Sequence, residues 1–258
     1  MHVDRAEQLA DAARVISDGA PHRALFFEGD EGIGKTALLI ELHQRHGDST
    51  VCYVDLATTW AAFDVLNRIC WQASGQGIPM DSFRALKQRY GEVPTVNFHG
   101  MSMDRSHLDI ALSVNADRET QNSALSDELV ARLTESATGA GSGSGSGSGS
   151  GPIVVLDGFD RCEPPLQRWI STSFLPDLLA TRRITVFLAG RSVPSLSHPY
   201  AGAVRNLILP PFDAATVQEW IDLVGIEELK GSAEELCGKL DGLPSAISEF
   251  LSQFTREG

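Results

Sequence analysis

The segment from Gly29 to Thr36, GDEGIGKT, has the spacing G-x-x-x-x-G-K-[ST]. Glycines let backbone N–H groups turn inward around a phosphate, because no Cβ blocks its approach. The Lys35 ammonium can reach the β- and γ-phosphate oxygens, and the Thr36 hydroxyl can coordinate Mg²⁺. The spacing therefore predicts a phosphate-binding loop, against the alternative of a glycine-rich turn with an exposed lysine. The expected nucleotide contacts are Gly29, Glu31, Gly32, Ile33, Gly34, Lys35, Thr36 and Ala37.

A second motif, IVVLDGFD, is an apolar run that leads into two carboxylates, Asp157 and Asp160. Open α/β sheets bind ligands at the carboxyl ends of their strands, so Asp157 is the expected partner of Mg²⁺. Asp160 is expected to orient or deprotonate the attacking water. Two alternatives stay open, because Asp160 could cap the following helix and Glu163 could carry the catalytic duty.

A third motif places Arg191 directly after the run ITVFLAG. An arginine at the tip of a strand beside a phosphate site can detect or stabilise γ-phosphate charge, although a solvated surface arginine is the alternative. The predicted catalytic set is Lys35, Asp160 and Arg191, and the predicted metal set is Thr36 and Asp157.

These motifs need a sheet whose strands end beside them. Continuous apolar runs alternate with helical patterns, which is typical of a parallel sheet covered on both faces. The sequence therefore predicts a doubly wound, mostly parallel α/β fold. The predicted strands are 24–29, 51–56, 95–100, 153–158, 184–190 and 206–210. The predicted helices are 6–16, 36–46, 60–72, 82–90, 123–134 and 166–180.

After Pro211 the pattern changes to helices alone, over 213–226, 232–242 and 243–254. Apolar residues share one face of the last helix, and Pro244 suits its first turn. We therefore expect a nucleotide-binding domain over 1–211 and a small helical subdomain over 212–258.

Glycine and serine alternate without a break from Gly141 to Gly151. This composition forms a flexible coil, and natural linkers are rarely so regular. We interpret the segment 137–152 as containing an engineered linker that replaces an insertion. The ends at Met1 and Gly258 suggest a piece of a longer protein.

Composition restricts the classes of function. The 258 residues are 42% hydrophobic and 21% charged, as in ordinary globular proteins. No run reaches the roughly 20 apolar residues of a spanning helix, and the first residues lack the basic-then-apolar order of a signal peptide, so export is not expected. The net charge of −13 disfavours nucleic-acid binding. Four scattered cysteines indicate reduced thiols in a cytoplasmic protein. His99 and His107 are expected to be surface or core residues and not ligands.

With these motifs placed, the chain resembles the STAND class of P-loop ATPases, which is related to the NB-ARC and NACHT families. EGDEGIGKTALL and VVLDGFD resemble the phosphate loop and the acidic motif of the class. LAGRS resembles its first sensor, and LDGLPSAI its Gly-x-Pro motif. HVDRAEQLADAARV is similar to the entry motif, although Asp4 replaces its glycine and Ala6 its glutamate.

The resemblance implies further contacts and a function. It makes Val3 and Arg5 candidate contacts of the base or ribose, and it places Pro244 near the adenine. It implies ATP or ADP with Mg²⁺ as cofactors, in a molecular switch that hydrolyses ATP slowly. It also implies self-association through the nucleotide-binding domain of the full-length protein to control signalling. No membrane or nucleic-acid partner is expected for this chain.

Two other functions stay open. One is a small-molecule P-loop kinase, although such kinases usually have an arginine-rich lid and the paired Arg182 and Arg183 stand just before a strand. The other is an AAA+-type regulator ATPase that acts on DNA, against which the acidity of the chain counts.

Overall fold

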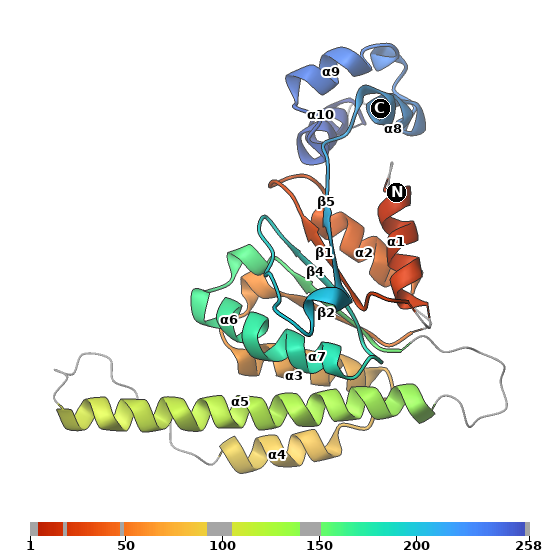
Figure 1. Cartoon of the computed structure of the whole chain (residues 1–258). Helices are drawn as coiled ribbons and strands as arrows, with labels where there is room; N and C mark the ends of the chain where they lie inside the picture. Colours follow the sequence, from red (N-terminus) through yellow and green to blue (C-terminus); the bar gives the residue numbers. More distant parts are fainter. Residues whose placement is uncertain (1–4, 18–19, 47–48, 92–104, 140–150, 256–258) are drawn as a thin grey trace.

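The computed structural model describes residues 5–17, 20–46, 49–91, 105–139 and 151–255 (Figure 1). Val3, His99, the side chain of His107 and the predicted strand over 95–100 lie outside this description. In the described part of the chain, five parallel strands form one sheet in the order β2-β3-β4-β1-β5. These strands are β1 (Ala24–Glu28), β2 (Val51–Asp55), β3 (Ile153–Asp157), β4 (Thr185–Gly190) and β5 (Val204–Ile208).

The sheet separates two hydrophobic cores, because successive side chains of a strand point to opposite faces. In β1, Leu25 and Phe27 pack with α1 (Ala6–Ile16) and α2 (Lys35–Arg45). Phe26 points to the other face, where it joins the larger core. The doubly wound α/β fold predicted from the sequence is therefore confirmed.

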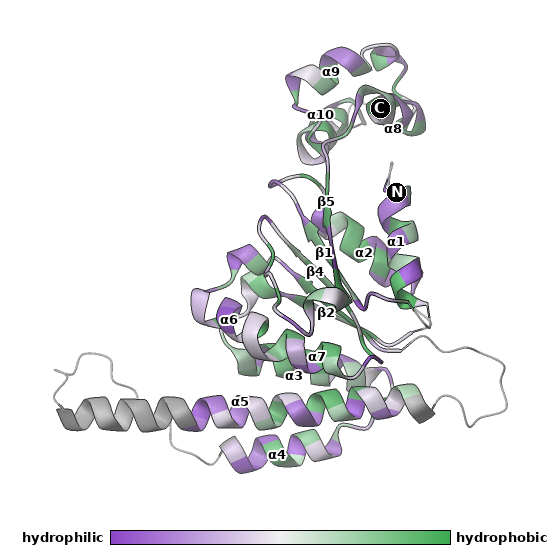
Figure 2. Ribbon diagram, viewed as in Figure 1, coloured by the Kyte–Doolittle hydropathy of each residue, from purple (hydrophilic) through white to green (hydrophobic). Residues whose placement is uncertain are grey.

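The second face is covered by helices that follow β2 and β3. They are α3 (Ala62–Gly75), α5 (Arg105–Gly139), α6 (Pro164–Trp169) and α7 (Leu175–Ala180). Helix α4 (Asp81–Gly91) lies on the outer side of α5 (Figure 1). In Figure 2, α4 and the coloured part of α5 carry both hydrophilic and hydrophobic residues, as expected of helices with one solvated face.

Two helices differ from their predicted bounds. Helix α5 extends over 35 residues where the sequence predicts only 123–134. The prediction found the part whose Leu125, Leu129 and Leu133 are buried. The helix predicted over 166–180 is α6 and α7 joined by a π-helical turn, η3 (Ile170–Phe174).

The last helices form a helical lobe, here defined as residues 212–255, beyond the upper end of the sheet (Figure 1). They are α8 (Ala214–Val224), α9 (Ala233–Lys239) and α10 (Pro244–Thr255). Their apolar residues form a third core that includes Val217, Ile221 and Ile247. Helix α10 begins at Pro244, one residue after the predicted start, so the proline lies in the first turn as expected. The division of the chain into domains at 211/212 stays a prediction.

Asp11 ties α1 to the sheet, because its buried carboxylate forms an ion pair with Arg205 of β5 at 2.8 Å. This contact holds the middle of α1 against β5. None of the described helices has the combination of length and apolar character that crossing a bilayer requires.

Candidate nucleotide-binding site

The strand order brings the three motifs to one edge of the sheet. Strand β4 lies between β1 and β3, so Arg191, directly after β4, lies between the loop that follows β1 and the acidic end of β3. In a parallel sheet all carboxyl ends meet at the same edge, where ligands bind. The sequence predicts each motif separately, and the strand order makes them neighbours.

The loop between β1 and α2 has the backbone of an anion cradle. Gly32 and Gly34 have φ angles of +79° and +92°, in the left-handed region that favours glycine. Helix α2 begins at Lys35, directly after Gly34. Its first-turn amides lack partners within the helix, and its dipole is positive at this end. The loop can therefore hold a phosphate by its main chain.

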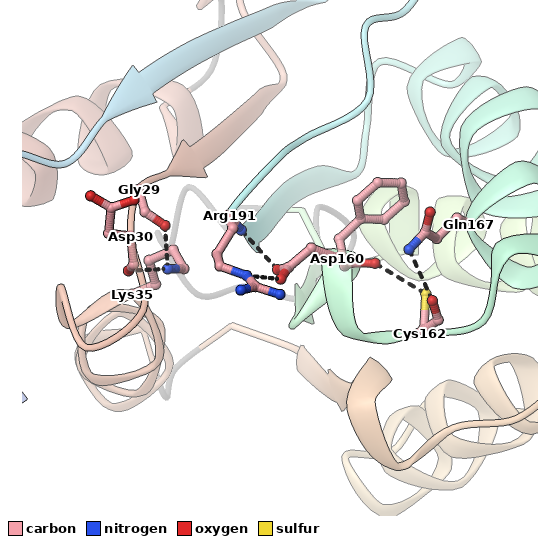
Figure 3. A network of polar contacts seen from close by, with 8 residues as sticks. Gly29, Asp30, Lys35, Asp160, Cys162, Gln167 and Arg191 are labelled. Carbon is pink, nitrogen blue, oxygen red and sulfur yellow. Dashed lines mark hydrogen bonds and ion pairs between the residues drawn. The ribbon is translucent and has the colours of Figure 1, made fainter.

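The Lys35 ammonium lies against the loop itself (Figure 3). Its Nζ donates to the carbonyl oxygens of Gly29 at 2.6 Å and Asp30 at 2.7 Å. Burial lowers the pKa of Lys35, and the carboxylates of Asp160 and Asp157 partly oppose this shift. The cation is thus held at the mouth of the cradle, where a polyphosphate could replace the two carbonyls as its partner.

Asp160 and Arg191 form a two-point contact across the edge of the sheet (Figure 3). The backbone N–H and the Nε of Arg191 each donate to the Asp160 carboxylate, both at 2.7 Å. Burial raises the pKa of Asp160, but these hydrogen bonds outweigh it and hold that pKa below its ordinary value. The Arg191 guanidinium and the Asp160 carboxylate are therefore hydrogen-bond partners in this structure.

The alternative that Asp160 caps a helix is wrong. Asp160 lies inside a short 3₁₀ helix, η2 (Phe159–Arg161), and the residue before α6 is Glu163. The Asp160 carboxylate faces Arg191 instead. Glu163 is absent from the residues that line the cavity described below, which weakens it as a competitor for catalysis.

Asp157 ends β3 and is buried, with its Oδ2 accepting a hydrogen bond from the Tyr53 hydroxyl at 2.8 Å. Burial and this hydrogen bond raise the pKa of Tyr53, so the phenol stays protonated and remains a donor. The register places Asp55 of β2 beside Asp157. Two carboxylates thus stand at adjacent strand ends.

The donor set suits magnesium held mainly by phosphates and water. The described residues contain no cluster of three or more His, Cys, Asp and Glu side chains that could hold a metal alone. Magnesium commonly takes one or two protein oxygens together with nucleotide phosphates. Thr36 and Asp157 line the same cavity as the loop, so the predicted metal set and the chemistry of Mg²⁺ are compatible.

A cavity of about 710 Å³ joins these groups to the helical lobe. Its wall includes most of the site residues predicted from the sequence, namely Arg5, Glu31, Gly32, Ile33, Gly34, Lys35, Thr36, Ala37, Asp157, Asp160, Arg191 and Pro244. Gly29 does not line it, although its carbonyl accepts from Lys35. Val3 lies outside the described residues. The roles assigned to these residues stay predictions.

Sequence reasoning missed a further group of lining residues, namely Ile40, Tyr53, Asp55, Gly158, Arg161, Phe212, Trp220, Ser245 and Ser248. Tyr53 and Asp55 lie on a predicted strand, and for Asp55 the position at the carboxyl end, where ligands bind, was the available signal. The lobe residues gave no signal, because only the packing of the lobe over the loop brings them to the cavity.

The phosphate loop and the lobe are in direct contact. The backbone N–H of Ser245 donates to the carbonyl of Gly32 at 3.1 Å. A Cβ at Gly32 would collide with the Ser245 hydroxyl. The first turn of α10 therefore rests on the loop that is predicted to hold phosphate.

Arg5 makes a second connection between the same parts. Its guanidinium is buried and donates to the carbonyl of Ile33 at 2.9 Å and that of Pro210 at 3.0 Å. It also lies over the Phe212 ring, 4.8 Å from the centroid. The predicted base or ribose contact of Arg5 stays a prediction, and the observed contacts give this arginine a bridging position.

The strand order, the glycine loop and the acidic strand together define the fold of P-loop NTPases. Two solved structures share it over nearly the whole chain. One is a Walker-type ATPase of Pyrococcus abyssi, with 13% identity, a TM-score of 0.55 and coverage of 95% of this chain. The other is a Signal Transduction ATPase with Numerous Domains (STAND) protein with a tetratricopeptide repeat sensor from Pyrococcus horikoshii, with 13% identity, a TM-score of 0.57 and 94% coverage.

These similarities concern the fold. The chain spans 66% of the first of these structures and 28% of the second. No protein-family model matches the chain, and no curated protein matches it.

Proposed function

We propose that this chain is the nucleotide-binding module of a STAND-type switch, which binds Mg-ATP or ADP between the sheet and the helical lobe. The observation that carries the proposal is the cavity whose wall combines Lys35 and Thr36 of the loop with Pro244 and Ser245 of the lobe. A ligand in this cavity contacts both parts at once. Its binding energy therefore depends on how the two parts are oriented.

The orientation of the bound nucleotide follows from the chemistry of the residues that line the cavity. The loop amides, Lys35 and Arg191 provide positive charge at the sheet edge, which suits the polyphosphate. Phe212 and Trp220 provide aromatic surface on the lobe side, which suits a base. We assign the phosphates to the loop and the base to the lobe.

Thr36 and Asp157 are the proposed holders of Mg²⁺, which neutralises phosphate charge when bound. Asp160 is the proposed group that orients the attacking water. Its contact with Arg191 gives a reason for slow turnover. While the two side chains hold each other at 2.7 Å, Arg191 is engaged and the carboxylate is less available as a base.

The switch rests on the contact between Gly32 and Ser245 and on the bridging position of Arg5. A nucleotide with a γ-phosphate presents more charge to the loop than ADP does, so the two ligands can favour different positions of α10. Self-association and control of signalling belong to the proposal by family resemblance alone.

Hydrogen exchange tests the switch. Amide exchange over 243–250 is compared in the nucleotide-free, ADP-bound and Mg-ATP-bound protein, with 123–134 of α5 as the reference segment. The proposal expects slower exchange over 243–250 in the bound states and a difference between ADP and ATP. Nucleotide binding without any change over 243–250 contradicts a switch. Transfer of labelled phosphate to an acceptor other than water favours a kinase instead.

A further inference from the structure

Tyr53 lies in β2, which is the first strand in the order of the sheet that the described residues form. Its ring packs partly against the core that α1 and α2 share with the sheet, and its hydroxyl donates to Oδ2 of Asp157 at 2.8 Å. Tyr53 and Asp157 both line the cavity. The Tyr53 phenol is therefore the hydrogen-bond donor to the Asp157 carboxylate among the described residues.

The backbone of Tyr53 is fixed by Gln72 of α3. The backbone N–H of Tyr53 donates to Oε1 of Gln72 at 2.9 Å, and Nε2 of Gln72 donates back to the carbonyl of Tyr53 at 2.7 Å. Gln76 holds Val51 in the same way, with both bonds at 2.9 Å. Among the described residues, the two amides take the place of a neighbouring strand along the side of β2 that faces away from β3. They therefore limit movement of the residue that contacts Asp157.

We propose that Tyr53 is a positioning residue for the magnesium carboxylate: its hydroxyl holds one oxygen of Asp157 and leaves the other for the metal or its coordinated water. This inference rests on the proposed function, since it concerns the same site. Partners of ligating carboxylates fix their orientation and commonly affect metal affinity. Tyr53 itself touches neither metal nor nucleotide in this role.

A free carboxylate would rotate among several orientations. The Tyr53 hydrogen bond selects one of them before the metal arrives, which lowers the entropy that binding must remove. Loss of the bond should therefore weaken the response to Mg²⁺ and leave the affinity for metal-free nucleotide unchanged. A residue with only a packing role would affect both measurements alike or neither.

The test is a calorimetric titration of the intact chain with ATP, first in EDTA and then over a series of Mg²⁺ concentrations. The variant Tyr53→Phe keeps the ring and removes the hydroxyl, and Tyr200→Phe is the matched control away from the site. We expect Tyr53→Phe to keep its ATP affinity in EDTA. For Tyr53→Phe, the Mg²⁺ concentration that gives half of the full change in ATP affinity should rise about five- to tenfold. Tyr200→Phe should behave as the unmodified protein.

A double-mutant cycle with Asp157→Asn isolates the pair. Tyr53→Phe should have no further effect on the Mg²⁺ dependence in the Asp157→Asn background, and an equal effect there overturns the inference. An unchanged Mg²⁺ dependence in Tyr53→Phe, or an equal loss of affinity in EDTA, also overturns it. Failure of the unmodified protein to bind ATP at all refutes the proposed function, which is a separate outcome.

Discussion

The Asp160 carboxylate binds Arg191 twice, once through the backbone N–H and once through Nε, with both distances at 2.7 Å. The side chain of Asp160 is 10% exposed and that of Arg191 59% exposed, so the pair lies at the boundary between the sheet edge and the cavity. The residue proposed to orient water and the residue proposed to sense the γ-phosphate are therefore in direct contact.

The first prediction concerns catalysis. Asp160→Asn should lower single-turnover ATP hydrolysis about 100-fold, because the amide cannot accept a proton from water. The dissociation constant for ATP should change by no more than about fivefold, since contacts between partly exposed charges are weak. Glu163→Gln is the control for the competing acid. A larger loss of hydrolysis in Glu163→Gln would transfer the catalytic role to Glu163.

The second prediction concerns pH. The folded protein holds the pKa of Asp160 below its ordinary value, so the ionised carboxylate contributes stability above the unfolded pKa, near 4. That contribution is lost as the pH falls through the lower, folded pKa. The difference in melting temperature between the unmodified protein and Asp160→Asn should be constant from about pH 7 to pH 5 and shrink below about pH 4.

Arg191→Gln serves as the control for the pH series, because it removes the Nε contact and keeps the backbone N–H that donates to Asp160. Its difference in melting temperature from the unmodified protein should also shrink below about pH 4, and it should be smaller than that of Asp160→Asn. A difference between the unmodified protein and Asp160→Asn that persists unchanged to low pH would mean that the ion pair does not stabilise the fold.

The third prediction concerns the loop backbone. Gly32→Ala should lower the free energy of unfolding by about 1–2 kcal/mol, because the φ of +79° disfavours a side chain. The new methyl group would also displace Ser245, so nucleotide affinity should fall as well. Denaturant unfolding and ATP titration measure the two effects.

Gly238→Ala in α9 is the matched control for the loop glycine. Its Cβ would meet open space, and alanine favours a helix, so it should raise the free energy of unfolding by about 0.4–1 kcal/mol. If Gly32→Ala is tolerated as well as Gly238→Ala, the loop does not require the observed backbone.

The fourth prediction concerns the base end of the cavity. Trp220 lines the cavity, whereas Trp71 of α3 is 77% exposed outside it. ATP should change the intrinsic tryptophan fluorescence, and Trp220→Phe should remove most of that change. Trp71→Phe should leave the change intact. The reverse pattern would place the base away from the lobe.

The local patterns predicted most of the fold. The strands at 24–29, 51–56, 153–158 and 184–190 are present within two residues of their predicted bounds, because a buried parallel strand is a continuous apolar run. The prediction covered the part of α5 in which Leu125, Leu129, Val130 and Leu133 are buried, at the spacing of one helix face. A helix without a core-facing stripe gives no periodic signal.

The sequence predicted each motif of the site, but it did not predict which side chains of different motifs contact one another. Asp160 and Arg191 are 31 positions apart, and Tyr53 and Asp157 are 104 apart. Such contacts depend on strand order and register, which residue types do not determine locally. Tyr53 was interpreted only as part of a strand, because it lies in the middle of β2 and only its long side chain reaches Asp157 and the cavity.

The central claim is that the glycine loop and Lys35 bind a nucleotide polyphosphate, and the titration of ATP into Lys35→Ala tests it most directly. Lys239→Ala, which removes an exposed lysine paired with Glu235 in α9, is the control. The account predicts tight binding by the unmodified protein and by Lys239→Ala, with a loss of roughly 10- to 100-fold for Lys35→Ala. Equal ATP affinity in all three proteins would contradict it.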